Sequence, residues 1–191
     1  SKLLNNKKKD LSQFLIMASE IKDIDKKREL YLELLDLFIE GGYKKEVEAI
    51  LQEYSELLIN EKRDVKFEFL VFKYRMKIGE YQLAEAARLQ TMKLAQGYML
   101  HYTFKIYLDI AKVTFKYSKI HLSEDLILEI ISSAKNIRTK PRLVGAFISL
   151  YEFFQQIGEI KRAKQFILEA WAETSNIIDG PIKSRMYLDI S

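Results

Sequence analysis

The chain has 191 residues, of which 48% are hydrophobic and 30% are charged, and its formal net charge is +4. This balance excludes intrinsic disorder, which combines low hydrophobicity with high net charge. The absence of cysteine excludes disulfides, thiolate metal sites and a cysteine nucleophile, and it favours a reducing, cytoplasmic location.

Helical periodicity runs along the whole chain. Apolar residues recur three or four positions apart, as at Leu30, Leu34 and Phe38, and this spacing places them on one face of a helix. Only two prolines and seven glycines interrupt the pattern, which leaves few turns for an all-β fold. In chain order we predict a helix near 10–22, hairpins at 24–60, 62–96, 98–138 and 141–177, and a further or capping helix at 181–191, all in one domain.

The breaks inside the predicted hairpins are evenly spaced. Gly42, Gly79, Ser118 and Gly158 are separated by 37, 39 and 40 positions. A period of about 34 to 40 residues accommodates two antiparallel helices and two short loops. We therefore predict an all-α fold, an α-solenoid of about four antiparallel helix hairpins with an extra helix at each end.

The last predicted hairpin carries the most specific pattern. Its large apolar residues, its glycine turn and the small residues that follow resemble the tetratricopeptide repeat, at Phe147, Leu150, Tyr151, Phe154, Gly158, Ile160, Ala163, Ile167 and Ala170. The resemblance implies a right-handed solenoid whose first helices line a concave groove that holds peptides. Because the period exceeds 34 residues, another α-solenoid such as a HEAT-like array stays open.

No group of residues in the sequence indicates catalysis or cofactor binding. The two histidines, His101 and His121, lack a glutamate at the helical spacing of a metal site. No glycine-rich phosphate loop occurs, and the serines lack the context of a nucleophile elbow. The apolar runs are far shorter than the roughly 20 residues that span a bilayer. We therefore expect a non-enzymatic protein without metal, cofactor or membrane segment.

The candidate site is a line of polar residues on each of two predicted first helices. One line has spacings of four, three and four, which keep its members on a narrow stripe of an otherwise apolar helix; it consists of Lys105, Asp109, Lys112 and Lys116. The preceding first helix offers the second line: Lys66, Lys73 and Lys77, interrupted by Phe69 and Leu70. The resemblance implies that both lines face the groove side by side.

Neighbouring lines of like charge repel each other unless solvent or a ligand neutralises them. We therefore predict a scaffold that binds a partner protein or peptide with acidic residues, while Phe69 and Leu70 hold an apolar side chain of that partner. One end of the groove is expected to be acidic, because the first array helix carries Glu29, Glu33, Asp36 and Glu40. The alternative for the lysines is an ordinary solvated helix face.

Two other functions stay open. Some helical-repeat proteins of similar period bind RNA, and the same lysines and aromatic residues suit a nucleic-acid strand; the run Lys7, Lys8 and Lys9 is more simply a solvated terminal segment. The chain also suits a ligand-sensing or oligomerisation domain of a larger regulator, including a homo-oligomer that pairs edge to edge.

Overall fold

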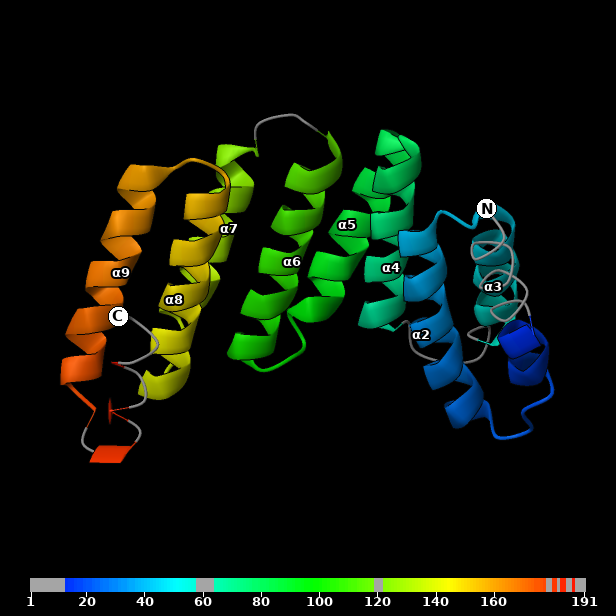
Figure 1. Cartoon of the computed structure of the whole chain (residues 1–191), viewed down its shortest axis with the longest axis horizontal. Coiled ribbons are helices and arrows are strands. Elements are labelled where there is room, and N and C mark those ends of the chain that lie inside the picture. The colour runs from blue at the N-terminus through cyan, green and yellow to red at the C-terminus, as the bar shows by residue number, and fades with distance from the viewer. Residues whose placement is uncertain are drawn as a thin grey trace, which may run out of the picture. The chain divides into compact units, whose positions relative to one another are not determined.

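The computed structural model describes residues 13–57, 64–118 and 122–177, together with residues 180, 181, 183, 184 and 187. All regular structure in these residues is helical, which confirms the all-α prediction (Figure 1). The helices are α2 (Ile24–Gly41), α3 (Lys44–Leu57), α4 (Val65–Ile78), α5 (Tyr81–Ala95), α6 (Leu100–Ser118), α7 (Glu124–Lys135), α8 (Lys140–Gln156) and α9 (Ile160–Ser175). Residues 13–19, ahead of α2, are also helical. The lysine run Lys7 to Lys9, His121 and parts of both predicted terminal helices lie outside the described residues.

The chain divides into two compact units, Ser1–Thr91 and Met92–Ser191, and each is described by itself. In the first unit α2 packs against α3 and α4. In the second unit α6 packs against α7 and α8, and α8 packs against α7 and α9. These helix pairs position the two sets of predicted site residues.

Glycine ends three of the helical segments where the sequence predicts turns. Gly42, Gly79 and Gly158 have φ angles of 74°, 81° and 83°, which is the left-handed region that a residue with a Cβ rarely adopts. The Gly79 amide donates a hydrogen bond to Met76 O at 3.2 Å, which gives this carbonyl in the last turn of α4 a partner.

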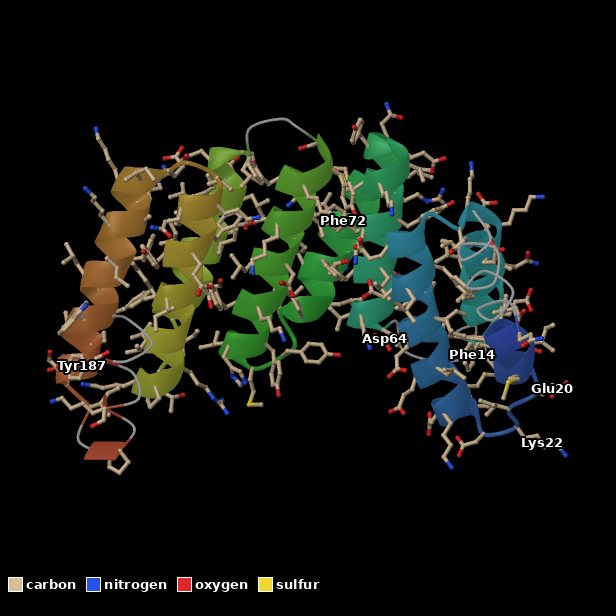
Figure 2. The ribbon with its side chains drawn as sticks, viewed as in Figure 1. Phe14, Glu20, Lys22, Asp64, Phe72 and Tyr187 are labelled. Carbon is tan, nitrogen blue, oxygen red and sulfur yellow. The ribbon has the colours of Figure 1, made fainter. Side chains whose placement is uncertain are left out.

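Side-chain caps begin several of the helices. Asp64 lies at the start of α4 (Figure 2), where its Oδ1 accepts hydrogen bonds from the amides of Lys66 at 2.7 Å and Phe67 at 3.3 Å. The hydroxyl of Ser123 accepts from the amide of Leu126 in α7. These contacts satisfy amides that have no partner inside the helix. Pro141 stands in the first turn of α8, as its lack of an amide hydrogen predicts.

Three buried tyrosines connect the helices of the first unit. The hydroxyl of Tyr31 donates to Glu53, that of Tyr54 to Asp64 at 3.1 Å and that of Tyr74 to Glu48 at 3.2 Å, so that each ring is buried while its oxygen has a carboxylate partner. Burial, with the neighbouring carboxylates, raises the pKa of Tyr54 and of Tyr74 to about 12. These bonds fix α2, α3 and α4 as a common framework.

The second unit has an aromatic and alanine core. The rings of Phe154 in α8 and Phe166 in α9 stack with centroids 5.5 Å apart, and Ala163 and Ala170 are buried on the face of α9. Small residues allow two helices to approach closely, and α8 and α9 pack against each other. Tyr187 lies beyond α9 (Figure 2). The centroid of its ring is 4.9 Å from that of Trp171 in α9.

Candidate functional site

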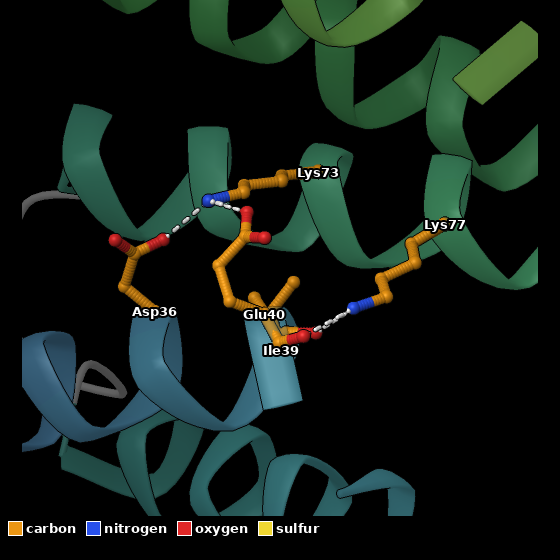
Figure 3. A network of polar contacts seen from close by, with 5 residues as sticks. All are labelled: Asp36, Ile39, Glu40, Lys73 and Lys77. Carbon is orange, nitrogen blue, oxygen red and sulfur yellow. Dashed lines mark hydrogen bonds and ion pairs between the residues drawn. The ribbon is translucent and has the colours of Figure 1, made fainter. Parts of the chain in front are cut away.

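Lys73 of α4 makes two ion pairs with α2. Its ammonium lies 2.7 Å from Asp36 Oδ1 and 2.7 Å from Glu40 Oε1 (Figure 3). The Lys73 side chain is 13% exposed, whereas the two carboxylates are about half exposed. Burial lowers the pKa of Lys73, but the hydrogen bonds and charges of the two carboxylates outweigh it, and the net direction is upward. The protein therefore neutralises this lysine itself and needs no partner to do so.

Lys77, one turn further along α4, caps the end of α2. Its ammonium donates to the backbone carbonyl of Ile39, and to that of Glu40 at 2.8 Å (Figure 3). A cation is favourable at this point because the last carbonyls of a helix carry partial negative charge and lack helical partners. Two of the three predicted lysines of α4 thus hold α4 against α2, while Lys66 is exposed.

The apolar pair predicted to hold a partner side chain lies mostly inside the first unit. Leu70 is 3% exposed and belongs to the core formed by α2, α3 and α4, against which Phe69 packs as a partly buried residue. Leu70 therefore does not present the exposed surface that the prediction required. The physical reason is that α4 is buried on several sides, with Phe67, Leu70, Phe72, Tyr74 and Met76 all in the interior.

The polar line of α6 borders a cavity in the second unit. Between α6 and α8 lies a pocket of about 300 Å³, here called the α6–α8 pocket, and it is lined by His101, Phe104, Lys105, Leu108, Asp109, Lys112, Ile137, Arg142, Gly145, Ala146 and Ser149. Three residues predicted from the sequence, Lys105, Asp109 and Lys112, are in this lining; Lys116 is exposed and is not. Lys105 and Lys112 have no ion-pair or hydrogen-bond partner within the part of the chain that the structure describes.

His101 and Arg142 join the two walls of the pocket at its end near the starts of α6 and α8. Arg142 Nη1 lies 3.0 Å from His101 Nδ1. Since a guanidinium only donates hydrogen bonds, Nδ1 must accept, which requires a neutral imidazole with its proton on Nε2. Consistent with this, desolvation and the nearby charge of Arg142 lower the pKa of His101. Sequence reasoning identified neither residue as part of a site.

A glycine inside α8 leaves open space in the wall of the pocket. Gly145 lines the pocket, and a Cβ built on it would meet no atom within 4 Å. Glycine in a helix interior is less favourable than alanine by about 0.5–1 kcal/mol. The signal that could have found this position was a glycine between Arg142 and Ser149, inside an otherwise strongly helical segment.

An exposed apolar segment adjoins the pocket. Tyr98, Met99, Leu100 and Tyr102 are each between 42% and 60% exposed, and they flank His101 in the sequence. The ring of Tyr102 lies 4.2 Å from that of His101. The second unit therefore offers apolar contact area of the kind that was predicted for Phe69 and Leu70, next to cationic side chains.

The lysines of α4 and those of α6 belong to different units, and their placement side by side stays a prediction. Within the described ranges no group of three or more histidine, aspartate or glutamate side chains could hold a metal ion. No helix of those ranges combines the length and the hydropathy that a membrane crossing requires.

Comparison of the chain with protein families, with curated proteins and with solved structures gives no match. The functional assignment therefore depends on the geometry of the α6–α8 pocket and on the sequence pattern.

Proposed function

We propose that this chain is a tetratricopeptide-like, right-handed α-solenoid of four hairpins that acts as a non-catalytic scaffold in the cytoplasm. It binds an acidic segment of a partner protein in the α6–α8 pocket. The observation that carries the proposal is the clustering of Lys105, Lys112 and Arg142 around a cavity whose lining contains one carboxylate, Asp109. Such an excess of positive charge attracts and orients an anionic partner.

The apolar and aromatic residues of the pocket and its surroundings favour a peptide as the ligand, rather than an isolated ion. Phe104, Leu108 and Ala146 supply apolar lining, and Tyr102, whose ring contacts that of the lining residue His101, adds exposed aromatic surface. Aromatic side chains with a polar tip are enriched at protein interfaces. The matching ligand is a segment with an acidic residue and an apolar residue close together.

The lysines of α4 take a different role in this proposal. Because Lys73 and Lys77 are engaged with α2, they stabilise the first unit instead of contacting the partner. The partner-binding residues are then Lys105, Asp109 and Lys112 from the predicted set, joined by His101, Arg142 and Gly145.

Site-specific photo-crosslinking tests this function. A photoreactive amino acid replaces Ser149 in the pocket, and in a matched control it replaces Lys164, which is exposed on α9 and outside the lining. We expect crosslinks to an acidic protein segment from position 149 that are absent from position 164. A crosslinked product that nuclease removes would favour the RNA alternative, and identical products from both positions would exclude the pocket as the binding site.

A further inference from the structure

The hollow beside Gly145 and the cations around it define what kind of acidic group fits the α6–α8 pocket. We propose that the pocket binds the phosphate group of a phosphoserine or phosphothreonine in the partner protein. This inference rests on the proposed function, and it goes further by naming the chemical group that is recognised.

Charge balance favours a doubly charged group. Lys105, Lys112 and Arg142 bring three positive charges and Asp109 one negative charge, while His101 is neutral because its Nδ1 accepts from Arg142. A carboxylate offers a single negative charge, whereas a phosphomonoester carries about −1.5 to −2 at pH 7. The phosphate therefore matches the net charge of the lining more closely.

The donors of the lining also suit three phosphate oxygens. The guanidinium of Arg142 has five N–H donors, of which one is engaged with His101, and its planar fork binds phosphate through two parallel hydrogen bonds. The ammonium groups of Lys105 and Lys112 add further charged donors, and charge-assisted hydrogen bonds are the stronger kind. Ser149 already donates its hydroxyl hydrogen to Gly145 O at 3.0 Å, so recognition depends on the three cations.

Shape distinguishes a terminal phosphate from the backbone of a nucleic acid. The cavity of about 300 Å³ is at the lower end of the range of pockets that hold ligands, and Gly145 in its lining leaves open space where a side chain would stand. A phosphomonoester ends in free oxygens that enter such a hollow, while a phosphodiester carries a sugar on both sides.

Three peptides that differ at one central residue test the inference. The central residue is phosphoserine, glutamate or serine between alanines, and binding to the full chain is followed at pH 7.5 by amide chemical shifts in NMR spectra. We expect the phosphoserine peptide to bind at least about tenfold more tightly than the glutamate peptide, and the serine peptide not to bind. Gly145→Leu, which fills the hollow, and Arg142→Gln should each weaken the phosphoserine peptide about tenfold or more. The matched variant Lys164→Gln, which removes a charge on α9 outside the lining, should leave it unchanged.

Equal affinity for the phosphoserine and glutamate peptides would overturn the phosphate inference and leave the proposed function intact, because any acidic segment would then suffice. Unchanged phosphoserine binding in both Gly145→Leu and Arg142→Gln would also overturn it, because the anion would bind elsewhere. The phosphate inference would likewise be overturned if the phosphoserine peptide did not bind at millimolar concentration. The proposed function itself is tested separately, because it fails if crosslinking from position 149 finds no acidic protein segment or gives the same products as position 164.

Discussion

The ammonium of Lys73 in α4 lies 2.7 Å from the carboxylate of Asp36 in α2. The two residues are 37 positions apart, and Glu40, one turn after Asp36, completes the contact from the same helix. Since the lysine is largely buried and both carboxylates are partly exposed, the ammonium depends on its partners for the solvation it has lost. The contact is therefore part of the packing of α4 on α2.

Replacing Lys73 by glutamine is expected to reduce the free energy of unfolding by about 1–3 kcal/mol, because two hydrogen bonds to charged groups disappear and two carboxylates of α2 lose their cation. Chemical denaturation followed by circular dichroism measures the effect. The control is Lys66→Gln on the same helix, whose exposed side chain should change stability by at most about 0.5 kcal/mol. Equal effects of the two substitutions would show that the ion pairs of Lys73 do not stabilise the unit.

Asp64 combines two roles at the start of α4. Its Oδ1 caps the helix, and its Oδ2 accepts the hydroxyl of Tyr54 from α3. Asp64→Ala is expected to lower the free energy of unfolding by about 1–3 kcal/mol, since the helix loses its cap and the Tyr54 hydroxyl loses its carboxylate partner. Asp64→Asn should cost less, because an amide oxygen also caps a helix. Denaturant titration of the three proteins provides the comparison, and an alanine variant as stable as the original would refute the assigned roles.

Gly145→Ala is expected to stabilise the fold by about 0.5–1 kcal/mol, because the added Cβ meets no neighbouring atom and alanine favours the helix. Thermal denaturation should show a higher midpoint. The same measurement on Gly145→Leu checks that loss of ligand binding does not reflect unfolding. A lower midpoint for the alanine variant would mean that the space beside Gly145 is not open.

Binding of an acidic ligand is expected to strengthen as the pH falls below the usual His pKa of about 6.5. In the free protein, desolvation and the charge of Arg142 lower the pKa of His101. A bound anion offsets the charges of Arg142 on α8 and Lys105 on α6, which raises that pKa. The proton that the complex takes up goes to Nδ1 and replaces the hydrogen bond that Arg142 donates there in the free protein. The pH dependence of the affinity is measured with a glutamate peptide, because its charge stays constant between about pH 6 and 8 and no phosphate titrates.

His101→Gln provides the control for this pH dependence, because glutamine has no proton to gain in this range. Its affinity should be flat between about pH 6 and 8. If the affinity of the original chain and that of His101→Gln depend on pH in the same way, another group takes up the proton and His101 is not the titrating residue.

Local patterns in the sequence predicted most of the helices and part of the candidate site. Gly42 and Gly79 were predicted as turns because they interrupt the helical pattern at regular spacing, and the structure confirms that they end α2 and α4, each with a positive φ. The spacing of Lys105, Asp109 and Lys112 predicted a common face, and all three line one pocket.

The remaining features depend on contacts between segments far apart in the sequence. The partners of Lys73 lie on α2, and nothing near Lys73 in the sequence indicates them. Arg142 and Gly145 join the site because α8 packs against α6. Leu70 appeared available for binding because a single sequence does not show on how many sides α4 is buried.

Binding in the α6–α8 pocket is tested most directly with the acidic segment that crosslinking identifies. Its affinity is measured for two triple variants of the chain. One variant replaces Lys105, Lys112 and Arg142 by glutamine, and the other makes the same change at exposed lysines outside the pocket lining, Lys93, Lys161 and Lys164. Both lose three positive charges, so long-range attraction weakens equally. If the segment binds in the α6–α8 pocket, the first variant should lose affinity about 100-fold or more, which is about 2.7 kcal/mol, and the second at most a few-fold. Similar losses in both variants would contradict binding in this pocket.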